Sequence, residues 1–262
     1  MASVLIVSWN LAGRVQRLGE QAERLLALEA DHLCLQEVTP NTLIRWEVLL
    51  SEAGYDAIQH GEPDPCTERS RPLMVLVASR RATKRVTVAD VPWPERVLAV
   101  KLADGTELIN VHSPISPKPD LAKVRTHEAV YAHLAENTVS HPRILCGDLN
   151  TPRKEHPDGR IWTFARDRYG RLREERGERW DQAELALIRG LEPYGFRDAF
   201  RTIHGPTRKE LSWEWPRWGG GYRLDHLLTS AECTVEDCRY EHEWRKEGLS
   251  DHSALVARVR RG

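Results

Sequence analysis

Short apolar runs of strand length alternate, in the first part of this chain, with runs of helical periodicity. Ser3–Trp9 and His32–Gln36 are apolar and rich in β-branched or large aliphatic residues, which is typical of buried strands. Between them, Arg14–Ala30 places its apolar residues at helical spacing. Thr39 and Pro40 then supply an N-cap and a proline at the first helical position. The order strand, helix, strand, helix predicts a sheet with helices packed on it.

The rest of the chain adds a hairpin and further strands. Val97–Leu102 and Thr106–Val111 flank an Asp104-Gly105 turn signal, which predicts an antiparallel pair. The other expected strands are Leu73–Ser79, Arg85–Val91, Arg143–Gly147, Leu211–Trp215, Tyr222–Thr229, Thr234–Glu243 and Ser253–Val259, and the other expected helices are Leu121–Asn137 and Asp181–Leu191. Two packed sheets covered by helices are the simplest architecture for so many mixed strands, so we expect an α/β fold.

One long stretch, Arg153–Arg179, lacks a clear period and is rich in both charge signs. We expect a surface excursion with little core. Its arginines follow a cluster of candidate site residues, and Arg153 is the one that we assign to substrate phosphates. Interleaved acids such as Glu155 favour a second interpretation for most of the others, namely a solvated surface held by salt bridges.

Composition and charge narrow the class of protein. The chain has 262 residues, of which 40% are hydrophobic and 29% charged, so we expect one globular domain over residues 1–262, acting as a monomer. The formal net charge is −1, so affinity for a nucleic acid would require a local basic patch. The first apolar run is too short to cross a membrane, and the five cysteines form no metal-binding or disulfide pattern. These features predict a cytoplasmic protein without membrane association.

Polar side chains stand where four of the apolar strands end. Asn10 ends the first strand, Glu37 the second, His112 an arm of the hairpin, and Asp148 with Asn150 the strand before the charged excursion. Ligands of α/β sheets bind outside the carboxyl ends of strands, so these side chains can converge on one cleft. Taken alone, each has an ordinary explanation as a turn or loop residue. Repetition of the pattern at four strands favours a site.

A further cluster lies near the C-terminus and adds acids to this set. Asp225 interrupts an apolar run, which is costly for a carboxylate without a partner. Asp251 and His252 precede the last strand, where they could be a cap or a contact to metal and phosphate. Carboxylate and amide oxygens are the donors that Mg²⁺ prefers, with Mn²⁺ as the substitute ion, whereas the spacing suits zinc poorly.

The ordered motifs resemble the endonuclease/exonuclease/phosphatase superfamily. They are Trp9-Asn10, Leu35-Gln36-Glu37, His112, Gly147-Asp148-Leu149-Asn150, Arg223-Leu224-Asp225 and Ser250-Asp251-His252. The C-terminal third is most similar to the exonuclease III branch of abasic-site endonucleases. The resemblance implies a four-layer α/β sandwich of two mixed sheets flanked by helices, with the site at one edge of the paired sheets.

The resemblance also implies a role for each site residue. Asn10, Glu37 and Asp251 would lie at the metal, with Glu37 as the main ligand. Asp148 would activate the attacking water, and Asn150 would help to hold the phosphate. His252, paired with Asp225, would donate to the phosphoryl oxygen, and we expect His112 to protonate the leaving oxygen. We also expect Trp213, Tyr222 and Leu224 to form an apolar pocket for an extrahelical sugar.

The leading hypothesis is therefore a Mg²⁺-dependent DNA repair nuclease that acts on double-stranded DNA, at abasic sites or at 3′ ends. Two departures weaken the match to the abasic-site branch, which usually has tyrosine in place of His112 and a polar amide in place of Ile115. They favour, as the alternative, a phosphatase or phosphodiesterase acting on RNA, a nucleotide or a small phosphoester. A non-catalytic binding protein is a poorer fit, because every expected catalytic residue type is present.

Overall fold

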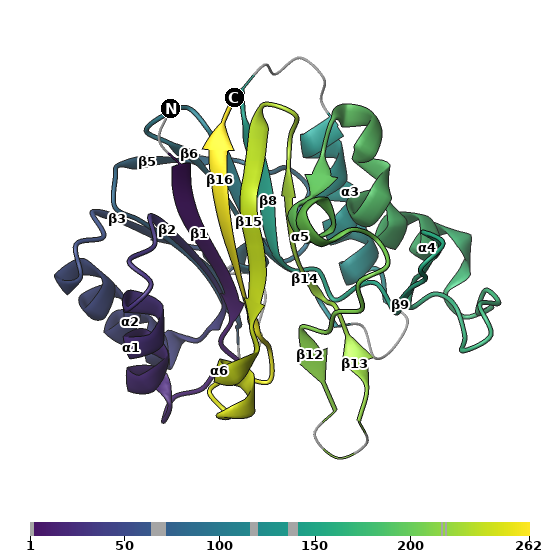
Figure 1. The fold of residues 1–262 in the computed structure, drawn as a ribbon, viewed down its shortest axis with the longest axis horizontal. Helices are drawn as coiled ribbons and strands as arrows, with labels where there is room; N and C mark the ends of the chain where they lie inside the picture. The colour runs from purple at the N-terminus through teal and green to yellow at the C-terminus, as the bar shows by residue number, and fades with distance from the viewer. Residues whose placement is uncertain (1–2, 64–71, 116–119, 136–140, 216, 218) are drawn as a thin grey trace.

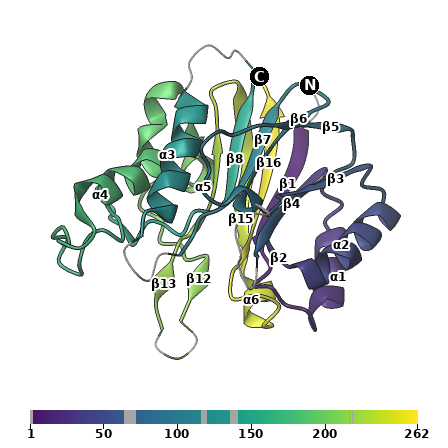
Figure 2. The same ribbon diagram turned by 180° about the vertical axis from the view of Figure 1, so that it is seen from behind.

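Two β-sheets pack face to face, and helices cover their outer faces (Figures 1 and 2). The structure, a computed structural model, describes residues 3–63, 72–115, 120–135, 141–215, 217 and 219–262. Helices α1 and α2 lie on one side of the paired sheets, and α3 and α4 lie on the other. The expected four-layer α/β sandwich is confirmed. None of the helices in the described ranges is long and apolar enough to span a membrane.

Each sheet has six strands and mixes parallel with antiparallel pairs. The first sheet has the order β15-β16-β1-β2-β4-β3 and the second has the order β11-β14-β8-β7-β6-β5. The strands of the first sheet are β1 Ser3–Asn10, β2 His32–Val38, β3 Ala57–His60, β4 Met74–Ser79, β15 Cys233–Glu241 and β16 Ala254–Arg261. Those of the second are β5 Thr83–Val86, β6 Val97–Leu102, β7 Glu107–His112, β8 Arg143–Asp148, β11 Arg197–Asp198 and β14 Asp225–Thr229.

Six α-helices and two short strand pairs complete the fold of the described residues. The helices are α1 Leu18–Leu26, α2 Pro40–Glu52, α3 Ala122–Ala135, α4 Gly177–Leu185, α5 Ala199–His204 and α6 His242–Lys246. The strand pairs are β9 Lys154–Glu155 with β10 Ile161–Trp162, and β12 Trp213–Glu214 with β13 Gly221–Tyr222. The second pair extends beyond the body of the sandwich, on the side opposite both chain ends (Figures 1 and 2).

Three apolar layers hold the sandwich together. Between the sheets, Ile6 and Val77 pack with Leu98 and Cys146 in one buried cluster. A second cluster, which includes Trp9, fills the space under α1 and α2, and a third lies between α3 and the second sheet. Each central strand has an apolar layer on both of its faces. Because alternate residues of a strand face opposite sides, most residues of such a strand are apolar, which explains the continuous apolar runs in the sequence.

Several expected elements have different bounds in the structure. The helix expected at Arg14–Ala30 begins only at Leu18, because Ala12 and Gly13 take positive φ angles of 54° and 58° in a turn. The strand expected at Arg85–Val91 is the edge strand β5, which follows β6 only as far as Val86. The expected end of one helix at Asn137 lies outside the described residues.

The charged excursion contributes only a few contacts to the core, as its composition predicts. Thr163 and Ala165 are fully buried, and Ala165 packs with Trp180 of α4 and Val124 of α3. Several of its charges are paired, as Glu155 with Arg201 and Arg166 with Asp181 show. The expectation of a surface excursion with little core is confirmed, because only Thr163 and Ala165 are buried among residues 153–179.

A buried amide crosses the space between the sheets and fills a bulge in β2. The pairing of β2 with β4 shifts register between Leu35 and Val38. There the side-chain amide of Asn110, from the other sheet, donates to the carbonyls of Leu35 and Leu76, each at 3.0 Å. Its oxygen accepts from Gln36 at 2.7 Å. Buried carbonyls need such partners, so Asn110 stabilises the local distortion.

Replacing Asn110 by leucine should therefore destabilise the fold more than a nearby packing change. The variant leaves two buried carbonyls and the Gln36 amide without this partner, and we expect the free energy of unfolding to fall by about 3 kcal/mol. Urea denaturation measures the effect. Ile109→Val in the same strand is the control and should cost only about 1 kcal/mol. Equal midpoints for the two variants would contradict the role of Asn110.

Candidate active site

The ends of strands from both sheets meet at one edge of the sandwich. In the first sheet β1 runs parallel to β2, with Asn10 beside Gln36. In the second, β7 runs parallel to β8, which sets His112 beside Asp148, and Asp225 begins the antiparallel strand β14 opposite Asp148. Gly147 permits the close approach, because a Cβ at this position would collide with the carbonyl of Val111. The expected convergence of these residues occurs at this edge.

Asn10 lies between two of the candidate carboxylates. Its amide nitrogen donates to Glu37 at 3.2 Å and to Asp148 at 3.0 Å, while its oxygen accepts from the backbone of Ala12. Asn10 is fully buried. In this arrangement the amide joins the two acids, and its oxygen is already engaged by the backbone.

Glu37 is held in an unusual backbone conformation at the β2 bulge. Its φ angle is 58°, in the left-handed region that side chains other than glycine rarely adopt. Its carboxylate is about one-fifth exposed and lies 3.6 Å from His112 Nε2. Burial raises the pKa of Glu37, and Asp251 raises it further, against the opposing effect of Asn10 and His252. A left-handed residue with a partly buried acid is a typical strained functional position.

His112 lies against a cation that the sequence pattern did not single out. Nη1 of Arg96 is 3.3 Å from Nδ1 and 3.4 Å from Nε2 of His112, so the guanidinium faces the imidazole ring. Burial, Arg96 and His252 together hold the pKa of His112 well below its ordinary value. A lowered pKa favours the neutral form of the His112 imidazole at pH 7. The expected role of His112 as the proton donor to the leaving oxygen stays a prediction, which this low proton affinity does not favour.

The loop after β8 is fixed by side chains on both sides. Asp148 accepts from the backbone of Asn150 at 2.9 Å, and the Asn150 amide donates to the carbonyl of Ser113 at 2.7 Å. The buried ammonium of Lys123 donates to the carbonyl of Asn150 and to Glu184, both at 2.7 Å. This buried ion pair on α3 and α4 thus sets the position of Asn150.

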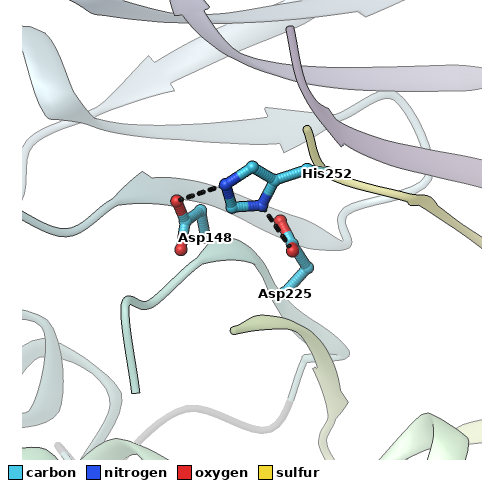
Figure 3. A group of neighbouring side chains, drawn as sticks. All are labelled: Asp148, Asp225 and His252. Atoms are coloured by element: carbon cyan, nitrogen blue, oxygen red, sulfur yellow. Dashed lines mark hydrogen bonds and ion pairs between the residues drawn. The ribbon is translucent and has the colours of Figure 1, made fainter. Parts of the chain in front are cut away.

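The imidazole of His252 lies between two carboxylates, Asp148 on one side and Asp225 on the other, and all three side chains of this line are buried (Figure 3). Nδ1 of His252 donates to Asp225 at 2.8 Å, and Nε2 lies 3.8 Å from Asp148. The two acids raise the pKa of His252 to about 10, although burial alone would lower it. Burial, together with Asp225, raises the pKa of Asp148 to about 7. The line therefore holds a proton on His252 and keeps Asp148 ready to accept one.

These three residues also lie close enough together to hold a metal ion. A protonated imidazole cannot bind a metal, however, and the short bond to Asp225 occupies Nδ1. The better donors are the oxygens of Glu37 and Asp251, because the negative charge of Asp251 raises the pKa of Glu37. A bound cation would offset the repulsion between these two carboxylates. Their hard oxygen atoms suit a divalent cation such as Mg²⁺. The residues present fit the metal that the sequence pattern implies.

An aromatic hairpin borders the site beside Asp251. The indole of Trp213 donates to Asp251 at 3.0 Å, and its ring lies parallel to that of Tyr222, with centroids 5.9 Å apart. Trp215 packs edge-on against both. The expected strand Tyr222–Thr229 is interrupted here, because the chain leaves the hairpin at Tyr222 and joins the second sheet only at Asp225.

The remaining expected substrate residues are near this hairpin but differ in exposure. Leu224 is buried, with 6% of its surface exposed, so it offers little surface to a substrate. Arg153 is half-buried and donates to the carbonyl of Arg166 at 3.4 Å. Arg223, from the same motif, is fully committed to ion pairs with Glu155 and Asp198. Its place in the motif is structural.

Two residues that contribute to the site were missed in the sequence. Arg96 could have been found from the hairpin, because Val97 pairs with Val111 and the preceding residue must then face His112. Lys123 carried no such signal, since a lysine in a helical pattern normally faces solvent. Only the packing of α3 on α4 buries it against Glu184.

Comparison with known proteins bears on this arrangement. A family model described as the Endonuclease/Exonuclease/phosphatase family matches residues 7–252. No curated protein matches the chain. Among solved structures, an AP endonuclease from Archaeoglobus fulgidus superposes with a TM-score of 0.73 at 22% identity, over 97% of this chain and 98% of that one. A D. rerio TDP2 humanized by 14 mutations superposes with a TM-score of 0.68 at 17% identity, over 98% and 99%.

The two solved structures share the fold with this chain, and the family model covers nearly all of its length, including every strand end that forms the site. The resemblance expected from the motifs is thereby confirmed. The chain belongs to the endonuclease/exonuclease/phosphatase family, and it is a hydrolase of phosphoester bonds.

Proposed function

We propose that this protein is a Mg²⁺-dependent phosphodiesterase that cleaves double-stranded DNA as a repair nuclease, at abasic sites or at 3′ ends. The observation that carries the proposal is the line Asp148–His252–Asp225 beside the acids Glu37 and Asp251. Phosphodiester hydrolysis requires a base for water and positive charge at the phosphoryl oxygens, and this cluster offers both. An AP endonuclease and TDP2 among the similar structures add support.

The base in this proposal is Asp148. A general base is most effective when its pKa lies near the working pH, and burial raises that of Asp148 to about 7. Asn150, fixed by Ser113 and Lys123, lies next to it and holds the water or the phosphate. The attacking water would thus lose its proton to Asp148 while Asn150 keeps it aligned.

Two groups neutralise the negative charge of the phosphate in this proposal, the imidazolium of His252 and the bound metal. The imidazolium of His252, held protonated by Asp225, donates to a phosphoryl oxygen. Glu37 and Asp251 would hold the metal, with Asn10 joining Glu37 to Asp148. When bound, Mg²⁺ supplies further neutralisation of the phosphate. His112, neutral and packed on Arg96, stabilises the arrangement of Glu37 and offers a hydrogen bond instead of a proton.

The aromatic hairpin and Arg153 supply the substrate contacts in this proposal. Trp213 and Tyr222 present parallel rings beside Asp251, where a sugar or base displaced from a duplex can stack. Leu224 forms the floor beneath them. Arg153 lies directly after the Asn150 loop and can contact a flanking phosphate.

A second candidate is a phosphatase or phosphodiesterase that acts on RNA, a nucleotide or a small phosphoester. Two observations favour it: His112 in place of tyrosine, and Ile115, which is 66% exposed where a polar contact to a duplex would be expected. The two candidates share the same chemistry and differ in what surrounds the phosphate.

The direct test is cleavage of a duplex that carries an abasic-site analogue. With Mg²⁺ the purified protein should cleave it, and EDTA should abolish cleavage. Asp148→Ala removes the base and should lower kcat by about a thousandfold. If the metal-replete enzyme leaves this duplex and a 3′-recessed end intact but hydrolyses a small phosphoester, the second candidate replaces the first.

Glu37→Gln tests the metal site separately from the base. The substitution keeps the shape and removes the charge, so the Mg²⁺ concentration for half-maximal activity should rise at least roughly tenfold. Glu52→Gln at the exposed end of α2 is the matched control and should leave the titration unchanged. An unaltered Mg²⁺ titration for Glu37→Gln would exclude it as the main ligand.

Asp225→Asn tests whether that acid keeps His252 protonated. Because Asp225 raises the pKa of His252, activity that needs the imidazolium should be lost only as the pH rises through about 10. In the variant the pKa falls, so the alkaline limb of the kcat profile should move to lower pH by at least about one unit. An alkaline limb that stays in place would show that His252 does not set it.

A further inference from the structure

A groove with an excess of positive charge starts at the loop that follows β8 and carries Asn150, here called the catalytic loop. The groove leads away from the site. It has a volume of about 470 Å³ and is lined by residues 152–157, 206–211 and 221–223. One end adjoins Pro152, two residues after Asn150, and the other wall includes Tyr222 of the aromatic hairpin. Residues of β9 and of β13 both line the groove.

The acids that line the groove are committed to other partners. Glu155 accepts from Arg223 and Arg201, with contacts as short as 2.7 Å. Glu210 lies 3.0 Å from His242 and also accepts from a backbone amide. Neither of these carboxylates is bound to the other cations of the groove.

Four cations remain after these pairs are removed, and they come from two loops far apart in the sequence. Arg153 and Lys154 follow the catalytic loop, while Arg208 and Lys209 follow α5. The side chains of Lys154, Arg208 and Lys209 are exposed, and Lys154 is positioned by packing over Trp162. The chain as a whole has a net charge of −1, so this concentration of cations is local.

We propose that this groove is a second binding site, for the backbone phosphates of a nucleic-acid strand outside the bond that is cleaved. Four cations in one groove suit a polyanion better than a single phosphate, because a strand offers a phosphate to each of them. Tyr222 and the stacked Trp213 lie where the strand would leave the site, so bases can stack while the phosphates follow the groove.

The inference rests on the proposed function for its substrate, and it makes that substrate more specific. A mononucleotide or small phosphoester would reach Asp148 without touching Lys154 or Lys209. A polynucleotide would use both. The groove would therefore favour a polynucleotide over a small phosphoester, whereas the catalytic cluster would accept both.

The test compares two double variants with the same chemical change. Lys154→Ala with Lys209→Ala removes two cations from the groove. Lys84→Ala with Lys101→Ala removes an exposed pair that faces each other across β5 and β6, at the opposite edge of the second sheet. Equilibrium binding of a fluorescent DNA duplex in EDTA is measured by anisotropy over a series of salt concentrations, with single-stranded DNA and RNA of the same sequence in parallel.

The groove variant should bind the preferred nucleic acid roughly tenfold more weakly, and the slope of log affinity against log salt should fall by about two, one for each lost phosphate contact. The control variant should match the wild type. Hydrolysis of bis(p-nitrophenyl) phosphate with Mg²⁺ should be the same in all three proteins. Equal affinities and slopes for the two double variants, with every nucleic acid, would overturn the inference.

Binding and cleavage give separate answers. A wild type that binds through the groove but cuts no nucleic acid would reject the proposed nuclease activity and keep the groove. A wild type that cuts DNA with unchanged binding in the groove variant would reject the groove and keep the activity.

Discussion

The candidate site depends on one buried polar contact between the sheets, the amide of Asn110 in the bulge of β2. The interface around it is apolar, and a strand that departs from regular pairing there must find partners for its carbonyls. Asn110 supplies them for Leu35 and Leu76. The bulge in turn gives Glu37 its left-handed conformation, so the position of Glu37 is fixed by a residue of the opposite sheet.

A similar dependence holds for Asp148. It ends a strand of the second sheet, but its pKa is set by burial between the sheets, by His252 and Asp225, and by Asn10 from the first sheet. The paired ends of two sheets therefore create a polar, water-poor seam in which a few charges act strongly on one another. Within that seam the two histidines differ: the acids on either side raise the pKa of His252, whereas burial and Arg96 lower the pKa of His112.

Charged residues outside the seam mainly form ion pairs that stabilise the fold. The number of charged residues in the sequence therefore gave little information about function. Arg223 is buried in ion pairs with Glu155 and Asp198, and these pairs attach the charged excursion to α5 and the second sheet. Removing one partner from such a buried pair is costly, so the segment is anchored despite its polar sequence. Four cations that take no part in these buried pairs, Arg153, Lys154, Arg208 and Lys209, line the groove beside Asn150.

The sequence by itself determined the order of most strands and helices, the two-sheet class and the set of polar residues at strand ends. It could do so because apolar period and strand-end position are local properties that the backbone preserves. Only the tertiary structure decided the start of α1, the break between Tyr222 and Asp225, and the parts played by Arg96, Asn110 and Lys123. These depend on which side chain meets which across two sheets, and so do the opposite protonation states of His112 and His252. A residue's charge in a buried site is fixed by neighbours that are distant in the chain, and no local pattern records them.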